Sequence, residues 1–231
     1  MKKFFVFTVC LIVTLCICII IFRDLIVKKT FEGILSNNLN RVVEIGSFDV
    51  GYLSGEVNLE KIEINNKDFP GKLLIIDKAF AQLDALSFYG ETIEIENILL
   101  DGVRVNYFSD ISNRASNNFN SLKKTLENKN RSNSKPDSKK FLIEQLDIKN
   151  INVSATSAEL NLTQKVKLND MKFTNLGNTK DSKSYRILTR EIIEIVNSEI
   201  KSKIKIGDID EEMIKDKIKE GLKNKLKKLL K

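Results

Sequence analysis

The stretch LEKIEINN, residues 59–66, returns twice in the chain, as IENILLDG at residues 95–102 and as IEQLDIKN at residues 143–150. The last two copies also match beyond the unit, as VRV at residues 103–105 and INV at residues 151–153. Each copy alternates apolar and polar residues, and each changes the phase of that alternation at the same place. A strand that changes phase contains a bulge or a corner. We therefore interpret the stretch as one β unit used three times in an elongated sheet. The alternative is three unrelated amphipathic strands.

The three copies share three apolar positions, and the resulting nine residues are the candidate lining of an apolar groove. They are Leu59, Ile62, Ile64, Ile95, Ile98, Leu100, Ile143, Leu146 and Ile148. If the copies stack in register, these side chains form rows on one face of the sheet. The glutamates of the copies, Glu60, Glu96 and Glu144, alternate with apolar residues and are expected on a solvated face rather than in an active site.

The composition excludes several classes of site. The chain has 231 residues with no His, no Trp and three Cys, and its net charge is +7. All three cysteines, Cys10, Cys16 and Cys18, lie in one apolar run, so they do not form a disulfide framework for a folded domain. A zinc site would need carboxylates alone. Without His, the commonest general base is missing, and the sequence has no G-x-S-x-G, P-loop or G-x-G-x-x-G motif. We expect no enzyme activity, no metal and no cofactor.

An apolar run from Phe4 to Phe22, interrupted by Thr8 and Thr14, precedes the rest of the chain. A helix of this length spans the hydrocarbon core of a bilayer, about 30 Å. A cleaved signal peptide is the alternative, but the end of the run offers no small residues for cleavage. We expect an uncleaved anchor within residues 1–30. Basic residues flank the run on both sides, so charge alone does not decide its orientation.

The remainder divides into four expected parts. A helical pattern at residues 25–41 leads into a first β-repeat unit, residues 31–108. Residues 109–140 read as a helix followed by a disordered insertion at 127–140, which contains no residue for a core. Residues 141–178 form a second β-repeat unit. Residues 179–231 form basic amphipathic helices, which either cap the sheet or lie on an anionic membrane surface; capping is favoured before Gly207. The predicted fold class is therefore mainly β with helices: an N-terminal transmembrane helix, an elongated curved antiparallel sheet and C-terminal amphipathic helices.

Five stretches follow one another along the chain: VEIGSF at residues 43–48, the Gly55 turn into VNLEKI at 57–62, FPG at 69–71, IEIENILLDGV at 93–103 and FLIEQLDI at 141–148. In this order of features the chain resembles the AsmA family of Gram-negative envelope proteins, including its branch with a domain of unknown function. The resemblance covers residues 1–178.

The resemblance implies an anchor in the bacterial inner membrane, a single pass, and a β-rich part in the periplasm. It further implies an apolar groove concerned with lipid handling or transport and with outer-membrane integrity and biogenesis. The expected partners are membrane lipids, with other envelope proteins or self-association as further candidates and no nucleic acid. The alternative function is an anchored scaffold or assembly factor that binds another envelope protein. The apolar face discriminates between them, since a continuous open lining favours lipid and a filled core favours the scaffold.

Overall fold

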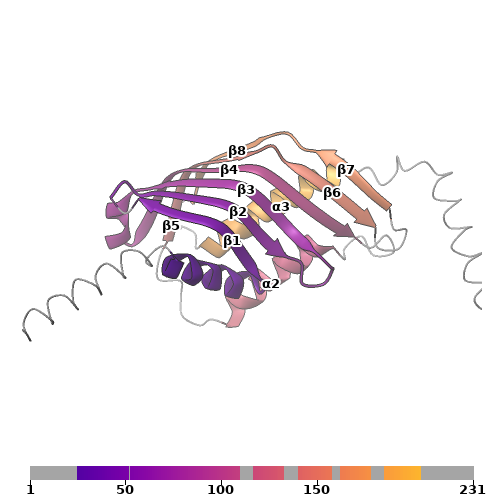
Figure 1. Ribbon diagram of the computed structural model, residues 1–231, viewed down its shortest axis with the longest axis horizontal. Coiled ribbons are helices and arrows are strands. Elements are labelled where there is room, and N and C mark those ends of the chain that lie inside the picture. The colour runs from indigo at the N-terminus through magenta and orange to yellow at the C-terminus, as the bar shows by residue number, and fades with distance from the viewer. Residues whose placement is uncertain are drawn as a thin grey trace, which may run out of the picture.

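The structure is a computed structural model that describes residues 25–51, 53–109, 117–132, 140–157, 162–177 and 185–203. These residues form a curved, unclosed β-sheet of eight strands, and the helices lie against its concave side (Figure 1). The strands are β1 (Val43–Gly51), β2 (Glu56–Asn65), β3 (Lys72–Leu83), β4 (Thr92–Ser109), β5 (Lys140–Lys149), β6 (Asn152–Ser157), β7 (Leu162–Lys167) and β8 (Met171–Leu176). The helices are residues 25–39, the short 3-10 helix η1 (Ala85–Tyr89), α2 (Asn118–Ser132) and α3 (Tyr185–Lys203).

The sheet is mixed, which corrects the expectation of a purely antiparallel one. Strands β1 to β4 form an antiparallel meander, but β5 and β6 both pair with β4 in parallel. Strands β8 and β7 then pair antiparallel with β5 and β6. The reason lies in the connection between β4 and β5. A hairpin reverses the chain, whereas the segment that contains α2 returns it to the same end of the sheet, as parallel pairing requires.

The second and third copies of the repeat lie side by side in register, with Ile98 opposite Leu146 and Leu100 opposite Ile148. The first copy does not share this register. Leu59 pairs with Ala79, and Ala79 pairs with Leu100, so Leu59 shares a row with Leu100 instead of with Ile95. The expected rows therefore hold for two copies. The intervening strand β3 sets the offset of the first copy, and nothing within the repeat itself encodes that offset.

The predicted change in the apolar–polar alternation is confirmed in all three copies, but its structural cause differs from one strand to the next. In β4 the pairing with β3 shifts between Gln82 and Leu83, which leaves Glu96 as the extra residue of a bulge. In β2 the register shows no shift at the corresponding position, where Lys61 adopts a left-handed conformation with φ 53°. In β5 the corresponding Glu144 lies opposite Asn175, where φ is 56°.

A second irregularity crosses the sheet at Gly102, where φ is 69°, and at the neighbouring Asn150, where φ is 53°. A β-carbon on Gly102 would lie 2.5 Å from Oδ2 of Asp77, whose carboxylate binds Arg104. Glycine is therefore required here by conformation and by space. Because the backbone turns at this point, Val103 and Val105 point into the core and continue the apolar face beyond Leu100.

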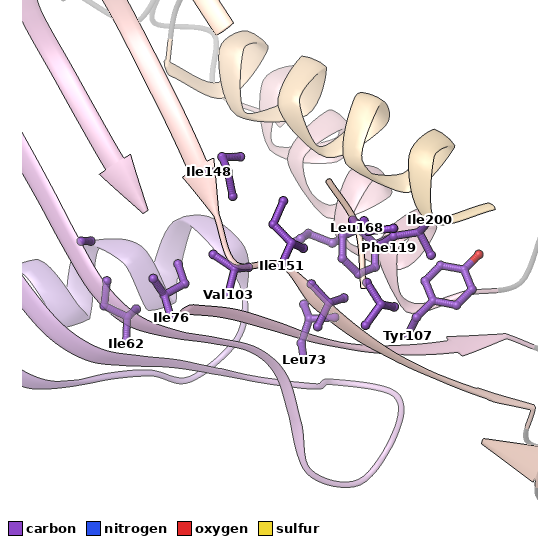
Figure 2. Close-up of a cluster of buried hydrophobic side chains, with 14 of the residues drawn as sticks. Ile62, Leu73, Ile76, Val103, Tyr107, Phe119, Ile148, Ile151, Leu168 and Ile200 are labelled. Carbon is purple, nitrogen blue, oxygen red and sulfur yellow. The ribbon is translucent and has the colours of Figure 1, made fainter. Parts of the chain in front are cut away.

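The core lies between the concave face of the sheet and the helices. Figure 2 shows Phe119 of α2 and Ile200 of α3 close to Tyr107 of β4 and to Ile151 and Leu168, which directly precede β6 and follow β7. The most deeply buried large apolar side chains are Leu73, Val105, Leu126, Ile151, Val153, Leu168 and Ile200. Both predicted β-repeat units thus contribute to one core.

Two of the helices differ from expectation in extent or position. Helix α2 continues to Ser132, so residues 127–132 are helical rather than part of a disordered insertion, while residues 133–139 lie outside the described residues. Lys123 reaches both Glu127 and Glu194, which helps to hold the polar part of α2 in place. Helix α3 lies across the concave face of the sheet instead of capping its end (Figure 1). The chain after residue 203 also lies outside the described residues.

The helix at residues 25–39 caps the free edge of β1. Glu32 Oε1 accepts a hydrogen bond from the Ile45 amide (2.8 Å), and Ser36 Oγ accepts one from the Val43 amide (2.9 Å). Lys28 Nζ donates to the Gly46 carbonyl oxygen (2.7 Å). Edge strands expose unpaired backbone groups that invite pairing with another chain. Here helix side chains satisfy these groups, so this edge is closed to strand addition at residues 43–46.

Glu32 gives this cap a pH dependence. Burial raises the pKa of Glu32, but hydrogen bonds from Lys29 and the Ile45 amide, with the charges of Lys29 and Lys28, lower the pKa more strongly, to below its ordinary value of 4.5. A depressed pKa contributes stability above pH 4.5 that is lost as the pH falls through the folded-state pKa. We expect Glu32→Gln to cost about 1–2 kcal/mol at neutral pH and to weaken the acid dependence.

Urea unfolding of the wild type and of Glu32→Gln, at neutral pH and in acid, measures this effect. Glu60→Gln is the control, because Glu60 is exposed on the opposite face of the sheet. Equal acid dependence in Glu32→Gln and the wild type would contradict the assignment.

Candidate functional site

The nine predicted groove residues all belong to one apolar cluster on the concave side of the sheet, but they differ in exposure. Ile62, Ile143, Leu146 and Ile148 are fully buried, at 3–8% exposed. The other five are half-buried and pack against the same cluster: Leu59, Ile64, Ile95, Ile98 and Leu100. The structure therefore brings the nine together and divides them into core residues and partly accessible ones.

The buried part of the face is filled by helices. Val105 and Val153, each 1% exposed, belong to the same cluster as α2 and α3 residues, and the ring of Tyr107 on β4 lies 5.9 Å from the ring of Phe119 on α2. Burial raises the pKa of Tyr107 to about 12, so its hydroxyl stays protonated at physiological pH. This region has the close packing of a protein interior and serves stability.

Four of the half-buried residues form a continuous group that we call the apolar strip: Leu59 on β2 and Ile95, Ile98 and Leu100 on β4. Leu59 is joined to Leu100 through Ala79, and Ile98 pairs with Ala81 of the same intervening strand. Ile95 pairs with Leu83, where β3 ends and leads into η1. The apolar strip thus extends from the filled core toward the end of the sheet that carries η1. The fifth half-buried residue, Ile64, lies at the other end, opposite Val43.

The opposite face of the sheet is mixed in character. A hollow of about 170 Å³ there is lined by Asn58, Glu60, Lys78, Phe80, Leu99 and Asp101, together with Leu59 and Ala79. The three repeated glutamates, Glu60, Glu96 and Glu144, are all exposed, and Glu96 lies at the bulge. Leu99 is half-buried but does not join the apolar cluster of the concave side. It therefore supplies a matched comparison for its neighbours Ile98 and Leu100.

A buried polar network fixes α2 to the sheet, and the sequence reasoning missed it. Asn118 is fully buried; its Nδ2 donates to the Asn106 carbonyl oxygen (2.7 Å) and to Asn66 Oδ1 (3.1 Å), and its Oδ1 accepts from the Phe108 amide (3.2 Å). The chain is rich in Asn, so nothing in its pattern singled out this one. Only its position at the first turn of the helix, where Asn is a common cap, offered a signal.

Arg41 lies beside this network with its side chain fully buried. Its Nη2 donates to the Asn118 carbonyl oxygen (3.5 Å) and to Ser121 Oγ (3.4 Å), and it lies 4.0 Å from Asp68 Oδ2. Burial lowers the pKa of Arg41, and the charge of Asp68 partly offsets this effect. The contacts join the start of β1 to α2 and to the β2–β3 turn, so this cation has a structural role.

The described residues contain no group of His, Cys, Asp or Glu placed to hold a metal ion. No described helix is long and apolar enough to cross a membrane, and the predicted anchor at Phe4–Phe22 lies outside the described residues. No family model and no curated protein sequence matches the chain. The concave face of the sheet and the sequence pattern are therefore the two features of the chain that bear on its function.

Proposed function

We propose that the chain is a non-enzymatic, AsmA-like protein of the bacterial envelope, anchored in the inner membrane with its sheet in the periplasm, and that it handles lipid acyl chains. The observation that carries the proposal is the apolar strip. Its four side chains lie next to one another, are half-buried, and continue an otherwise closed hydrophobic core. Half-buried apolar residues in a contiguous group mark sites for apolar ligands or partners more often than singly exposed ones do.

The location of the apolar strip supports lipid as the ligand. It faces the concave side of a curved sheet and extends toward the end that carries η1. The buried portion of the face, including Ile148, is filled and offers no space to a ligand, so the proposed binding surface is smaller than the nine residues suggested by the repeats. A shorter surface of this kind fits part of an acyl chain, with the rest of the lipid remaining in the bilayer or in solvent.

We expect Ile98→Asp to remain folded and to lose most of its bound lipid. Ile98 is already partly accessible, so a carboxylate there keeps some hydration, whereas it repels an acyl chain. The measurement is mass spectrometry of lipid that co-purifies with the full-length chain, alongside a thermal melt. Leu99→Asp is the matched control, since it places the same charge one residue away on the other face.

Three outcomes of this experiment decide between hypotheses. Loss of lipid in Ile98→Asp but not in Leu99→Asp supports the proposal. Equal lipid content in the wild type and in a folded Ile98→Asp variant would remove it. Unfolding of Ile98→Asp would mean that the apolar strip is closed core as well.

The last outcome would favour the alternative, an anchored scaffold or assembly factor. One observation already favours that alternative: α2 and α3 fill much of the concave face, as in an ordinary core. The surface available to a protein partner would then be the outer edge formed by β7 and β8, each of which pairs with a single strand among the described residues. Lys165, Lys167 and Lys172 line this edge, a charge pattern that discourages indiscriminate strand pairing.

A further inference from the structure

One end of the sheet carries the most exposed apolar side chains of the described residues. Leu53 in the β1–β2 turn is fully exposed, and Tyr89 and Leu86 of η1 are 92% and 77% exposed. Leu25 and Ile26, at 52% and 60%, begin the described part of the first helix. We call Leu53, Leu86 and Tyr89 the apolar tip. Isolated exposed apolar residues are common, and Ile34, Val42 and Ile195 are examples, but the three most exposed ones gathered at one end of the sheet indicate a contact surface.

The β1–β2 turn and η1 are held next to each other. Leu83, just before η1, donates its amide hydrogen to the Gly55 carbonyl oxygen (3.0 Å), and Gln82 Nε2 donates to the Ser54 carbonyl oxygen (2.7 Å). Gly55 has φ 75°, and a β-carbon there would collide with the Leu83 carbonyl oxygen. The close approach of the two segments thus depends on glycine at position 55.

Three hydrogen bonds hold the backbone of helix η1 in place. Asp84 Oδ1 accepts from the Leu86 amide (2.8 Å), and Ser87 Oγ donates to the Asp84 carbonyl oxygen (2.6 Å) and accepts from the Glu94 amide (3.0 Å). These bonds hold the backbone that presents Leu86 and Tyr89 to solvent. An exposed leucine on this helix has no role in the core of the domain.

The described chain begins at this same end. The first helix runs antiparallel to β1, with Ser36 bound to Val43, Glu32 bound to Ile45, and the rings of Phe31 and Phe48 5.6 Å apart. From Phe31 back to Leu25 the helix extends about 9 Å. From Phe48 to Gly51 the strand extends about 10 Å in the same direction. Leu25 and the β1–β2 turn therefore lie at a similar level, and Figure 1 shows the first helix, in indigo, below β1 in the half of the sheet that carries η1.

The sequence upstream identifies what this end faces. The apolar run ends at Phe22, three residues before Leu25, and three residues span at most about 11 Å. If the run crosses a bilayer, as in the proposed function, the end of the sheet that carries the apolar tip must lie within reach of the membrane surface. Tyr and Leu are suited to the interfacial region, where Tyr sits at headgroup level.

We infer that the apolar tip inserts into the lipid surface beside the anchor and thereby fixes the orientation of the sheet relative to the membrane. The inference rests on the anchor of the proposed function but not on lipid binding by the apolar strip. Contact is apolar rather than electrostatic, because Asp84, Glu91 and Glu56 flank the tip and would not attract anionic headgroups. With the tip in the interface, the apolar strip opens toward the bilayer, as a surface that exchanges acyl chains with it requires.

Single tryptophans test this inference, because the chain contains none. We place Trp at position 53, 86 or 89 of the full-length chain, in lipid nanodiscs made with either ordinary lipid or lipid brominated in its acyl chains. Insertion of the tip by about 5–10 Å should bring each Trp to the acyl boundary and produce about a twofold loss of emission with brominated lipid. These positions are exposed, so the substitutions leave the core intact, and a thermal melt verifies this.

Val42→Trp is the matched control. Val42 is 54% exposed and lies at the other end of β1, so its emission should be unaffected by bromine. Equal quenching at the tip positions and at position 42, or none at the tip, would overturn the inference. If the chain did not elute with the nanodiscs, both the insertion of the apolar tip and the proposed membrane anchor would be overturned. The lipid content of Ile98→Asp is measured independently, so loss of that proposal leaves the tip result standing.

Discussion

Ile148→Asp is expected to unfold the domain under conditions in which the wild type is fully native. Ile148 is 5% exposed, pairs with Leu100 on one side and with Met171 on the other, and belongs to the filled part of the concave face. An ionised carboxylate there has no partner and cannot reach water without opening the sheet. The expected cost is about 4 kcal/mol or more, a large fraction of the total stability of a small domain.

Far-UV circular dichroism melts of the full-length chain in detergent provide the measurement. Ile148→Val is the control, since it removes one buried methylene and should cost about 1 kcal/mol. If Ile148→Asp unfolded at the same temperature as the wild type, the core would be open to solvent at the position of Ile148. The binding surface proposed for the apolar strip would then extend across the third repeat, as the sequence alone suggested.

Ile148 is buried and Ile98 is half-buried, and the sequence could not predict this difference. Both occupy apolar positions of the same repeat unit, and the periodicity correctly placed both in one apolar cluster. Their difference in burial arises from α2 and α3, which pack over one part of the face and not over the other. A repeat pattern carries no information on where a distant helix will lie, so the division into core and apolar strip required the structure.

The direction of β5, the strand that carries the third copy, likewise required the structure. The phase change, the strands and the turn at Gly55 follow from local alternation and from turn residues, and they were predictable. Parallel pairing of β5 with β4 depends on the path of the connecting chain. For that connection the sequence pattern predicts a helix and then a disordered insertion at residues 127–140, whereas α2 continues as far as Ser132. A polar sequence cannot build a core, but it can extend a helix whose preceding turns are already anchored by Phe119, Leu122 and Leu126.

The apolar tip is a second feature that could not be predicted from the sequence. Its three residues do not stand out in the sequence, where Leu53 lies in a turn and Leu86 and Tyr89 lie in a short helix later in the chain. The contact between Gly55 and Leu83 brings the two segments together, and the antiparallel packing of the first helix on β1 places Leu25 at the same end of the sheet. Of these features, only the apolar run at residues 4–22 was evident from composition.

Asn118→Leu is expected to detach α2 from the sheet and to cost about 3–5 kcal/mol. Leucine keeps the branched shape and the number of side-chain heavy atoms of asparagine, although it is larger. The loss comes from the Asn106 carbonyl and the Phe108 amide, which Asn118 now satisfies and which would be left without that partner in the interior. An unsatisfied buried backbone group costs about 1–3 kcal/mol. Lys124→Leu, an exposed change on the same helix, should stay within about 0.5 kcal/mol of the wild type.

Hydrogen exchange distinguishes local detachment from global unfolding in Asn118→Leu. If the network anchors α2, the amides of α2 and of the end of β4 near Phe108 should exchange faster, while those of β1 and β2 should keep most of their protection. Because α2 and α3 contact each other through Asn120 and Asn197 (3.3 Å) and through Lys123 and Glu194 (2.7 Å), protection of α3 should fall with that of α2. A cost near 1 kcal/mol with unchanged exchange would mean that apolar contacts alone hold α2 in place. The filled part of the concave face would then depend on Phe119, Leu122 and Leu126, and not on the buried asparagine.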